Sequence, residues 1–350
     1  MRLDRGEEPG GGGRQAVWAG RTGRADVQCL GVWTEKRPGL GEDAEPTLLL
    51  RQSGNAGVVG VYDGLGGAGA RLLGHTVDGR PVSHAFAASR LAHLTVQEWF
   101  AGGHTGGQPL EDRLREVFDA ARPPSARKLR GTITKQLPTT LALIDFWRPD
   151  PAEPLRALAR WAGDSRCYLL TPDRGLQQIS RDDSIVDDPL ETLMADQPLT
   201  NQVAAGLPFR LRQQLVYPLP EPCVLLCATD GFFGYVPSPA MFEFELLDNL
   251  GRATSLAEWG RRLADWRCRT AGDDATLALV AIGFGSFRGL WSGFQHRYSH
   301  LEREHAQPLR ELQHAPLDDG ERQRRLEEFR LLSWKTYCGM YLERMAGRAL

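Results

Sequence analysis

The stretch Val58-Val59-Gly60-Val61-Tyr62-Asp63-Gly64-Leu65-Gly66-Gly67 joins a short apolar run to an acidic residue followed by glycines. The apolar run is typical of a buried strand bounded by turn residues. At its end the Asp63 side chain is free to point into a cleft, and the glycines let the backbone turn sharply. A carboxylate beside an exposed backbone carbonyl suits Mg²⁺ or Mn²⁺, which prefer oxygen ligands. An Asp-Gly pair after a strand is also a common turn, so this stretch alone leaves both interpretations open.

The same combination of an apolar run with an acidic residue at its edge recurs along the chain. The acidic residues at such edges are Glu42, Asp43, Asp63, Asp164, Asp230, Asp273 and Asp274. If these edges converge in the fold, their carboxylates form one metal cluster. Two of the residues have simpler explanations, since Asp164 before Ser165-Arg166 also fits a turn and Asp274 fits a turn cap.

Composition and charge exclude several classes of partner. The chain has 350 residues and a formal net charge of −2, which gives no electrostatic reason to expect nucleic acid. No apolar run reaches the ~20 residues that a membrane helix needs, and no apolar signal segment begins the chain. Most of the cysteines lie in apolar runs and are expected to be buried free thiols, which suits a reducing cytoplasm. We therefore expect a cytoplasmic protein with no nucleic-acid or membrane partner.

The order of predicted elements favours an α+β fold. Helices are expected over residues 83–100, 110–121, 239–250 and 255–269, with strands before, between and after the two pairs. Because strands and helices do not alternate strictly, a central antiparallel β-sandwich flanked by helix pairs fits better than a doubly wound parallel sheet. Residues 183–219 are interpreted as a long insertion of the kind that often forms a functional flap.

Three regions are expected along the chain. Residues 1–24 are rich in Gly and Arg and are expected to be disordered, residues 25–285 form the main domain, and residues 286–350 form a C-terminal helical extension. Apolar side chains at helical spacing on both sides of Pro316-Leu317-Asp318-Asp319-Gly320 predict a helical hairpin. Its apolar stripe must be buried, either against the rest of the chain or against a partner such as a cognate kinase or a second copy.

Six motifs, taken in order, resemble the metal-dependent type 2C (PPM) Ser/Thr protein phosphatases, particularly their bacterial branch. The motifs are Glu42-Asp43, Asp63-Gly64-x-Gly66-Gly67, Thr139-Thr140-Leu141, Gly163-Asp164-Ser165-Arg166, Thr229-Asp230-Gly231 and Asp273-Asp274-Ala275-Thr276. The resemblance runs from about Asp26 to Gly283. The fold of that family is a central β-sandwich flanked by helix pairs, which agrees with the element order.

The resemblance implies a hydrolase that uses two Mn²⁺ or Mg²⁺ ions, and a third in some members, to remove phosphate from phosphoserine or phosphothreonine in protein substrates. The implied metal-binding positions are Glu42, Asp43, Asp63, Gly64, Asp164, Asp230 and Asp273. Among them Asp63 bridges two ions, Gly64 supplies its carbonyl, and Asp164 matches the position of a third, weaker ion. Ions about 3.5–4 Å apart activate a water molecule and neutralise phosphoryl oxygens.

Three positions depart from the family pattern. Leu65 stands where many eukaryotic members have a histidine that acts as general acid, and Gly234 stands where many members have another aspartate. The position of the phosphate-binding arginine is Pro38, and a one-residue shift of the loop assigns that role to Arg37. These departures support a second hypothesis, a weak or inactive phosphatase-like module that docks a partner through its C-terminal helices.

Overall fold

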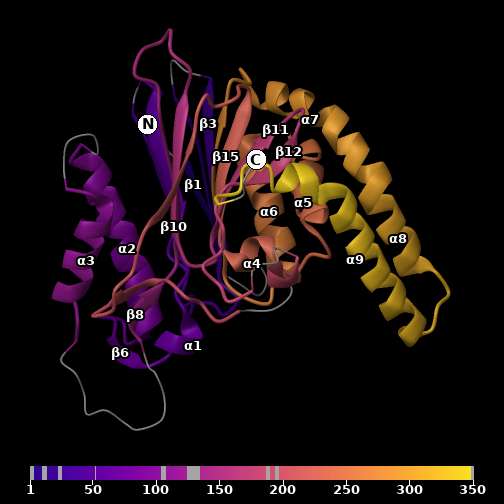
Figure 1. The fold of residues 1–350 in the computed structure, drawn as a ribbon. Helices are drawn as coiled ribbons and strands as arrows, with labels where there is room; N and C mark the ends of the chain where they lie inside the picture. The colour runs from indigo at the N-terminus through magenta and orange to yellow at the C-terminus, as the bar shows by residue number, and fades with distance from the viewer. Residues whose placement is uncertain are drawn as a thin grey trace.

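Two antiparallel β-sheets stacked face to face form the centre of the protein, and helices cover both outer faces (Figure 1). The computed structural model describes residues 4–9, 14–22, 26–51, 53–103, 108–123, 135–186, 190–193 and 197–347. Apolar side chains from the facing sheets fill the space between them, including Val59 and Ile144 from one sheet and Leu225 and Val280 from the other. The predicted α+β sandwich is therefore confirmed.

The larger sheet has seven strands in the order β1-β2-β3-β16-β15-β11-β12. These strands are β1 (Asp4–Pro9), β2 (Arg14–Arg21), β3 (Val27–Thr34), β16 (Ala275–Ile282), β15 (Cys223–Ala228), β11 (Arg166–Thr171) and β12 (Gly175–Gln178). The smaller sheet has the order β14 (Arg212–Val216), β10 (Arg156–Ala162), β9 (Leu141–Trp147), β5 (Ala56–Val61) and β4 (Thr47–Leu50). Two short ladders pair β13 (Val203–Ala205) with β8 (Gln136–Thr139) and β6 (Leu72–His75) with β7 (Pro81–Ser83).

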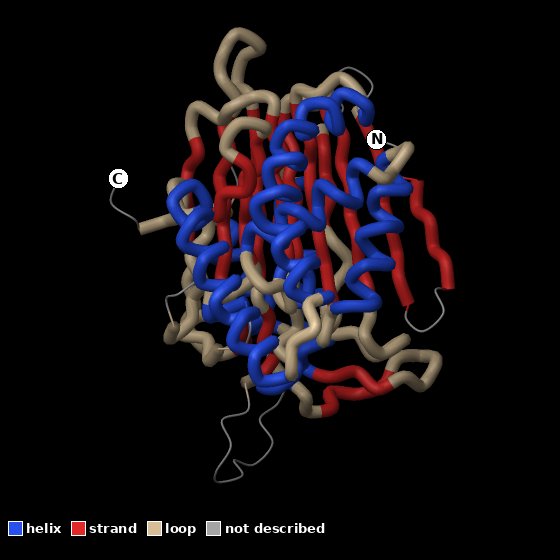
Figure 2. The backbone as a smooth tube through the Cα atoms, turned by 90° about the vertical axis from the view of Figure 1, so that its right-hand side faces the viewer, coloured by secondary structure: helices blue, strands red, loops and turns tan. Residues whose placement is uncertain are grey.

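Each sheet carries a pair of long helices on its outer face. The smaller sheet is covered by α2 (His84–Ala101) and α3 (Leu110–Ala120), and the larger sheet by α5 (Pro239–Gly251) and α6 (Leu256–Thr270). Figure 2 shows the helices that lie over the larger sheet. Ser83 and Ser255 cap α2 and α6 by accepting hydrogen bonds from the backbone N–H groups of Phe86 and Glu258. The shorter helices are α1 (Gly66–Gly69), η1 (Glu191–Leu193) and α4 (Asp230–Phe233).

The N-terminal segment corrects one expectation. Residues 1–24 were expected to be disordered, yet the described parts of this segment form β1 and β2. β2 pairs with β3 along its whole length, and its Ala16, Val17 and Trp18 side chains are buried. Burial of this apolar triplet outweighs the Gly- and Arg-rich composition around it, which is what the disorder prediction rested on.

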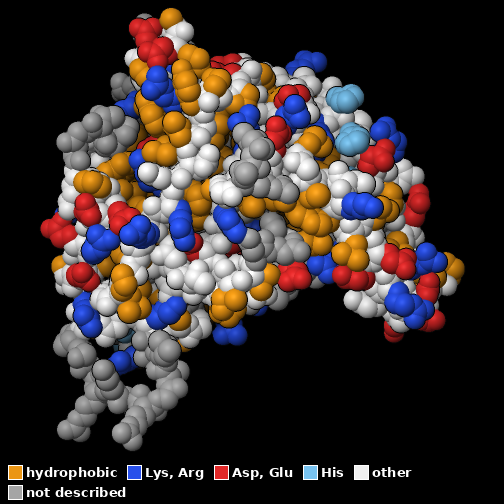
Figure 3. Space-filling view, viewed as in Figure 1, with side chains coloured by type: hydrophobic (Ala, Val, Ile, Leu, Met, Phe, Trp, Pro, Cys, Tyr) orange, Lys and Arg blue, Asp and Glu red, His pale blue; other side chains and the backbone are white. Residues whose placement is uncertain are grey.

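The C-terminal extension forms the predicted helical hairpin. Its first arm runs through α7 (Phe287–Leu301), the π-helical turn η2 (Glu302–Ala306) and α8 (Gln307–His314), and its second arm is α9 (Asp319–Tyr341). Phe294, Tyr337 and Tyr341 are buried in the same core as Phe242 of α5. Of the two alternatives for the apolar stripe, the structure therefore shows packing against the chain itself. Acidic and basic side chains are intermixed on the projecting end of the hairpin (Figure 3).

The last described residues lie along β12, the edge strand of the larger sheet. The Ala346 N–H donates to the Ile179 carbonyl at 2.9 Å, just beyond the end of this strand. The Gln177 side chain donates to the Met340 carbonyl at 3.3 Å and accepts from Arg344 at 3.1 Å. The chain thus closes one edge of its own sheet.

The cysteines are free thiols, and the described helices are not of the membrane-spanning kind. All six cysteines are free, and Cys29, Cys167, Cys223 and Cys227 are buried as expected. Across the part of the chain that the structure describes, no helix combines the length and the apolar character needed to span a bilayer.

Candidate metal centre

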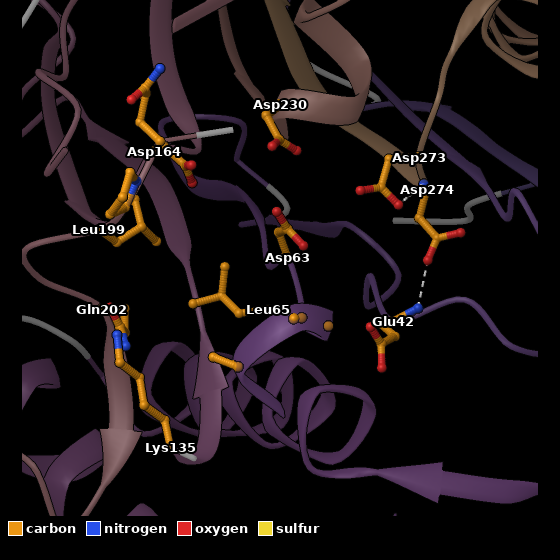
Figure 4. Close-up of a pocket in the computed structure, with 16 residues that line it drawn as sticks. Glu42, Asp63, Leu65, Lys135, Asp164, Leu199, Gln202, Asp230, Asp273 and Asp274 are labelled. Carbon is orange, nitrogen blue, oxygen red and sulfur yellow. Dashed lines mark hydrogen bonds between the residues drawn. The ribbon is translucent and has the colours of Figure 1, made fainter. Parts of the chain in front are cut away.

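Acidic side chains from distant segments meet in one pocket between α1 and α4 (Figure 4). The pocket has a volume of about 460 Å³. Its acidic lining residues are Glu42, Asp63, Asp164, Asp230, Asp273 and Asp274. They stand where strands of both sheets begin or end, so stacking the sheets is what brings them together. The predicted convergence of acidic strand ends therefore occurs in the fold.

Asp63 lies at the centre of this group (Figure 4). Its backbone carbonyl accepts hydrogen bonds from the Thr139 hydroxyl at 2.6 Å and from the Thr140 N–H at 2.9 Å, which fix the end of β5. Burial raises the pKa of the Asp63 carboxyl well above its ordinary value, and neighbouring carboxylates raise it further. Those neighbours are, in decreasing order of effect, Asp43, Asp230, Asp164 and Asp273.

Glu42 is held in place from several sides. Its backbone N–H donates to Asp274 at 2.6 Å, and its carboxylate accepts from the Ser83 hydroxyl at 2.5 Å. The glycines after Asp63 make room for it, because a Cβ at Gly66 would lie 2.1 Å from a Glu42 carboxylate oxygen. A Cβ at Gly64 would lie 2.6 Å from the Glu42 backbone carbonyl. These glycines are therefore needed for close packing of two loops.

Asp43 is buried behind the pocket and is not among its lining residues. Its Oδ2 accepts hydrogen bonds from the Thr276 hydroxyl at 2.7 Å and the Thr229 hydroxyl at 3.0 Å. Burial and then the charge of Asp274 raise its pKa well above the ordinary value. Asp43 thus adds negative charge beneath Asp63, and its predicted contact with a metal-bound water stays a prediction.

Asp164 lies at the turn between β10 and β11, on the other side of Asp63. Its Oδ1 atom is buried and has no hydrogen-bond partner. Burial, then the charges of Asp230 and Asp182, raise the pKa of Asp164 well above its ordinary value. An uncompensated buried carboxylate is costly unless a cation binds it, so this atom supports metal binding over the simple turn interpretation.

Asp230 and Asp273 complete the rim at the start of α4 and just before β16. One carboxylate oxygen of Asp230 accepts from the Gly231 N–H at 2.6 Å, and one of Asp273 accepts from the Asp274 N–H at 2.8 Å. These bonds fix both side chains at the mouth of the pocket. Asp274 itself accepts from the backbone N–H groups of Lys36 and Glu42, in agreement with the expected turn role.

The donor set fits hard divalent cations. The ionisable ligand atoms at the pocket are carboxylate oxygens, apart from the ammonium group of Lys135. Among the described residues, no three His, Cys, Asp or Glu side chains are grouped tightly enough to hold one ion. Mg²⁺ is commonly bound through one or two carboxylates while it keeps several waters, so a spread of single carboxylates around a pocket matches its needs.

Arg37 differs from the other predicted site residues. It lies in an exposed turn, where its carbonyl accepts from the Leu40 N–H at 3.0 Å, and it is not among the residues that line the pocket. Its phosphate-binding role stays a prediction that the geometry does not support. Leu65 does line the pocket, and none of the lining residues is a histidine.

Sequence reasoning missed Lys135 and Gln202, which line the wall opposite the acidic rim (Figure 4). Neither residue belongs to a recognisable motif. They become neighbours of the site through the pairing of β8 with β13, two segments far apart in the sequence. A single sequence carries no local signal for such pairing.

Comparison with solved structures identifies the class of fold. The serine/threonine phosphatase PstP/Ppp of Mycobacterium tuberculosis matches with a TM-score of 0.50 and 18% identity, over 73% of this chain and 99% of that chain. The serine/threonine phosphatase Stp1 of Staphylococcus aureus matches with a TM-score of 0.52 and 18% identity, over 75% of this chain and 98% of that chain. The chain therefore has the fold of the PPM-type Ser/Thr phosphatases.

Other comparisons add little to this assignment. A structure of the catalytic domain of PstP in complex with two manganese ions also matches, with a TM-score of 0.48 and 18% identity, over 73% of this chain and 98% of that chain. No protein-family model matches the chain, and no curated protein matches it either. At these identities the likeness establishes the fold, and activity has to be argued from the site.

Proposed function

We propose that the protein is a metal-dependent phosphatase that hydrolyses phosphoserine or phosphothreonine in protein substrates. The observation that carries this proposal is the half-buried Asp63 carboxyl at the centre of the pocket, whose pKa is raised by burial and by the charges of Asp43, Asp230, Asp164 and Asp273. Buried like charges destabilise a protein unless a ligand neutralises them. Divalent cations are the ligands that carboxylate oxygens of this kind select.

The residues that would hold the ions are those implied by the family resemblance. Asp63 would contact two ions and the Gly64 carbonyl one of them, while Asp230 and Asp273 would each contact one. When bound, such ions lower the pKa of a coordinated water and neutralise the phosphoryl oxygens. Mn²⁺ and Mg²⁺ both suit the site, and Asp164 offers a place for a third ion.

The chain itself supplies position and charge. Hydrogen bonds from Thr139 and Thr140 hold the backbone at Asp63, and Asp274 and Ser83 hold Glu42. Leu65 provides no proton for the leaving serine or threonine oxygen, and no histidine lines the pocket in the described part of the chain. We infer that water takes the place of a histidine as the proton donor to the leaving group, which predicts faster cleavage of esters with good leaving groups.

A non-catalytic module that binds a phosphorylated partner is the second candidate. The exposed position of Arg37 favours it, because the expected phosphate-binding side chain is not at the pocket. Its expected docking element is less well supported, since the aromatic side chains of α7 and α9 are buried within the protein. In either case we propose a cytoplasmic phosphoprotein as the ligand, with a Ser/Thr kinase as the opposing enzyme.

Phosphate release from p-nitrophenyl phosphate distinguishes the two candidates. We expect turnover with Mn²⁺ or Mg²⁺ and none after chelation with EDTA. A phosphoserine peptide tested in parallel should also be cleaved, more slowly. If neither substrate is cleaved with either metal while the protein is folded, the enzymatic proposal fails and the binding module remains.

A further inference from the structure

The pocket has two chemically different walls. One wall is the acidic rim around Asp63 already described. The other is formed by Lys135, Leu199 and Gln202, with Gln197 and Pro198 beside them (Figure 4). Among the described residues that line the pocket, Lys135 carries the one basic side chain.

The second wall is built by the short β8–β13 ladder. Lys135 directly precedes β8 and Gln202 directly precedes β13, and these strands run antiparallel with Val203 opposite Thr139. The two residues therefore start from opposite ends of the ladder. Figure 4 shows the Lys135 side chain extended along the wall on the side of Gln202, and both residues line the same pocket.

Gln202 is nearly buried yet lacks a partner. Its exposed fraction is 6%, and its side chain makes no hydrogen bond to any described residue. Although the residue as a whole is nearly buried, its amide group still reaches the water of the pocket and is free to bond to a ligand. Because Gln202 lines the pocket, a ligand bound there can displace that water and take its place as the partner of the amide.

Lys135 is also available for a ligand. No carboxylate in the described ranges forms an ion pair with it, although the opposite wall of the same pocket is acidic. Burial lowers its pKa, and no neighbouring charge acts on it. A cation held apart from the carboxylates of its own pocket suits an anion brought by the substrate.

We propose that Lys135 and Gln202 form a subsite that binds an oxyanion of the phosphorylated protein substrate. The inference rests on the proposed function and assigns it a substrate-binding residue. The oxyanion has two possible sources, the phosphoryl group itself or an acidic side chain beside the phosphorylated residue. Both present oxygens that accept hydrogen bonds from an ammonium and an amide.

The test uses the variants Lys135→Met, Lys135→Arg and Gln202→Leu in the full-length protein. Lys36→Met is the matched control, since Lys36 is exposed and does not line the pocket. Kinetics are measured with p-nitrophenyl phosphate and with two phosphoserine peptides, one with acidic and one with neutral neighbours. We expect Lys135→Met to raise KM about tenfold with kcat little changed, and Gln202→Leu to raise it less. Lys135→Arg should retain most of the affinity because it keeps the charge.

The pattern across substrates identifies the source of the oxyanion. A raised KM for all three substrates assigns the subsite to the phosphoryl group. A raised KM for the acidic peptide alone assigns it to a neighbouring side chain. If KM for every substrate stays within the range of Lys36→Met, the proposal is wrong. A merely structural role is also excluded by the expected rescue in Lys135→Arg and by unchanged thermal unfolding.

Binding measurements separate this proposal from the proposed enzymatic activity. Fluorescence polarisation of the labelled acidic phosphopeptide, with Mn²⁺ present, reports affinity whether or not hydrolysis occurs. If the protein never hydrolyses a substrate but loses peptide affinity in Lys135→Met, the subsite stands and the enzymatic assignment falls. If the wild type binds neither phosphopeptide, the subsite is disproved.

Discussion

Two groups of charged side chains in this protein, one under the C-terminal hairpin and one at the pocket, have opposite electrostatic surroundings. Under the C-terminal hairpin, Glu243 is fully buried and pairs with both Arg297 Nε and Nη2 at 2.8 Å. The Tyr337 hydroxyl hydrogen-bonds to the same carboxylate. Although burial alone lowers the pKa of Arg297, the hydrogen bonds and charge of Glu243 raise it above its ordinary value. In the pocket, by contrast, the carboxylates around Asp63 raise one another's pKa.

This difference distinguishes charged groups that hold the fold together from charged groups that are suited to bind a ligand. A guanidinium partner neutralises a buried carboxylate, and the resulting ion pair holds two elements together, here α5 and α7. A group of carboxylates that repel one another, as around Asp63, is unfavourable in a way that a bound cation can relieve. Substitutions in the two groups should therefore have opposite effects on stability and on activity.

Removal of the hairpin should have the largest effect. Truncation after Ser286 deletes Phe294, Tyr337 and Tyr341 from the core shared with α5, and it leaves Glu243 without Arg297. We expect an insoluble or non-cooperatively unfolding product, measured by solubility and thermal denaturation. Substitution of Leu331, which is exposed on α9, by Ser serves as the control and should change neither property. A soluble and fully active truncation would instead show that the hairpin serves a partner.

Neutralising the centre of the pocket should abolish activity and spare the fold. Asp63→Asn keeps the shape of the side chain but removes the charge that offsets two cations, so we expect a loss of about a thousandfold or more in metal-dependent turnover. In EDTA the variant should be at least as stable as the wild type, because one of several repelling charges is gone. Retained turnover, or clear destabilisation, contradicts the assignment of Asp63.

Breaking the ion pair between Glu243 and Arg297 should have the opposite effect, a loss of stability. Arg297→Met leaves Glu243 buried without its cation and should lower the free energy of unfolding by about 3–5 kcal/mol. Urea denaturation measures the change. The control is Arg325→Met, because Arg325 pairs with Glu321 on the solvent-exposed side of α9, and it should leave the midpoint unchanged. Equal effects of the two substitutions would show that the buried pair is no more important than a surface one.

The smallest expected effect is a loss of stability at acidic pH. Burial, then the charges of His300 and Arg297, lower the pKa of His305 from 6.5 to about 4. In the unfolded chain His305 therefore binds a proton near pH 6.5, whereas in the folded chain it binds that proton only near pH 4. Stability is complete above pH 6.5 and falls as the pH drops towards 4, by at most about 1.4 kcal/mol per pH unit.

His305→Gln tests this dependence. It should flatten the fall in urea midpoint between pH 6.5 and 5, leaving the share of His93, whose pKa burial also lowers to about 4. An unchanged slope would place the acid sensitivity elsewhere. The variant also loses the contact between His305 Nδ1 and the Ser333 hydroxyl at 2.9 Å, so the comparison is made on slopes rather than on absolute midpoints.

The parts of the site that could be predicted from sequence are those encoded locally. An apolar run that ends in Asp-Gly specifies both a strand and an acidic residue at its edge, and the Asp63 and Asp230 found in this way both line the pocket. The parts that could not be predicted depend on pairing between distant segments. β2 joins the sheet through Trp18 and its neighbours despite a flanking composition typical of disorder, and β8 meets β13 although four strands of the main sheets lie between them in the sequence. Arg37 was assigned from the family resemblance with a one-residue shift of its loop, and its role stays a prediction, since the path of an exposed loop is not encoded in a local pattern.

The contact of the C-terminal residues with β12 bears on aggregation. An edge strand with free backbone groups is a template on which another chain can add a strand. Here the Leu176 carbonyl accepts from the Tyr337 hydroxyl at 3.4 Å, and the Ile179 carbonyl accepts from the Ala346 N–H. The hairpin and the residues after it therefore cover part of this edge strand of the sheet. We expect that loss of only the last few described residues would leave the protein folded while exposing this strand to neighbouring molecules.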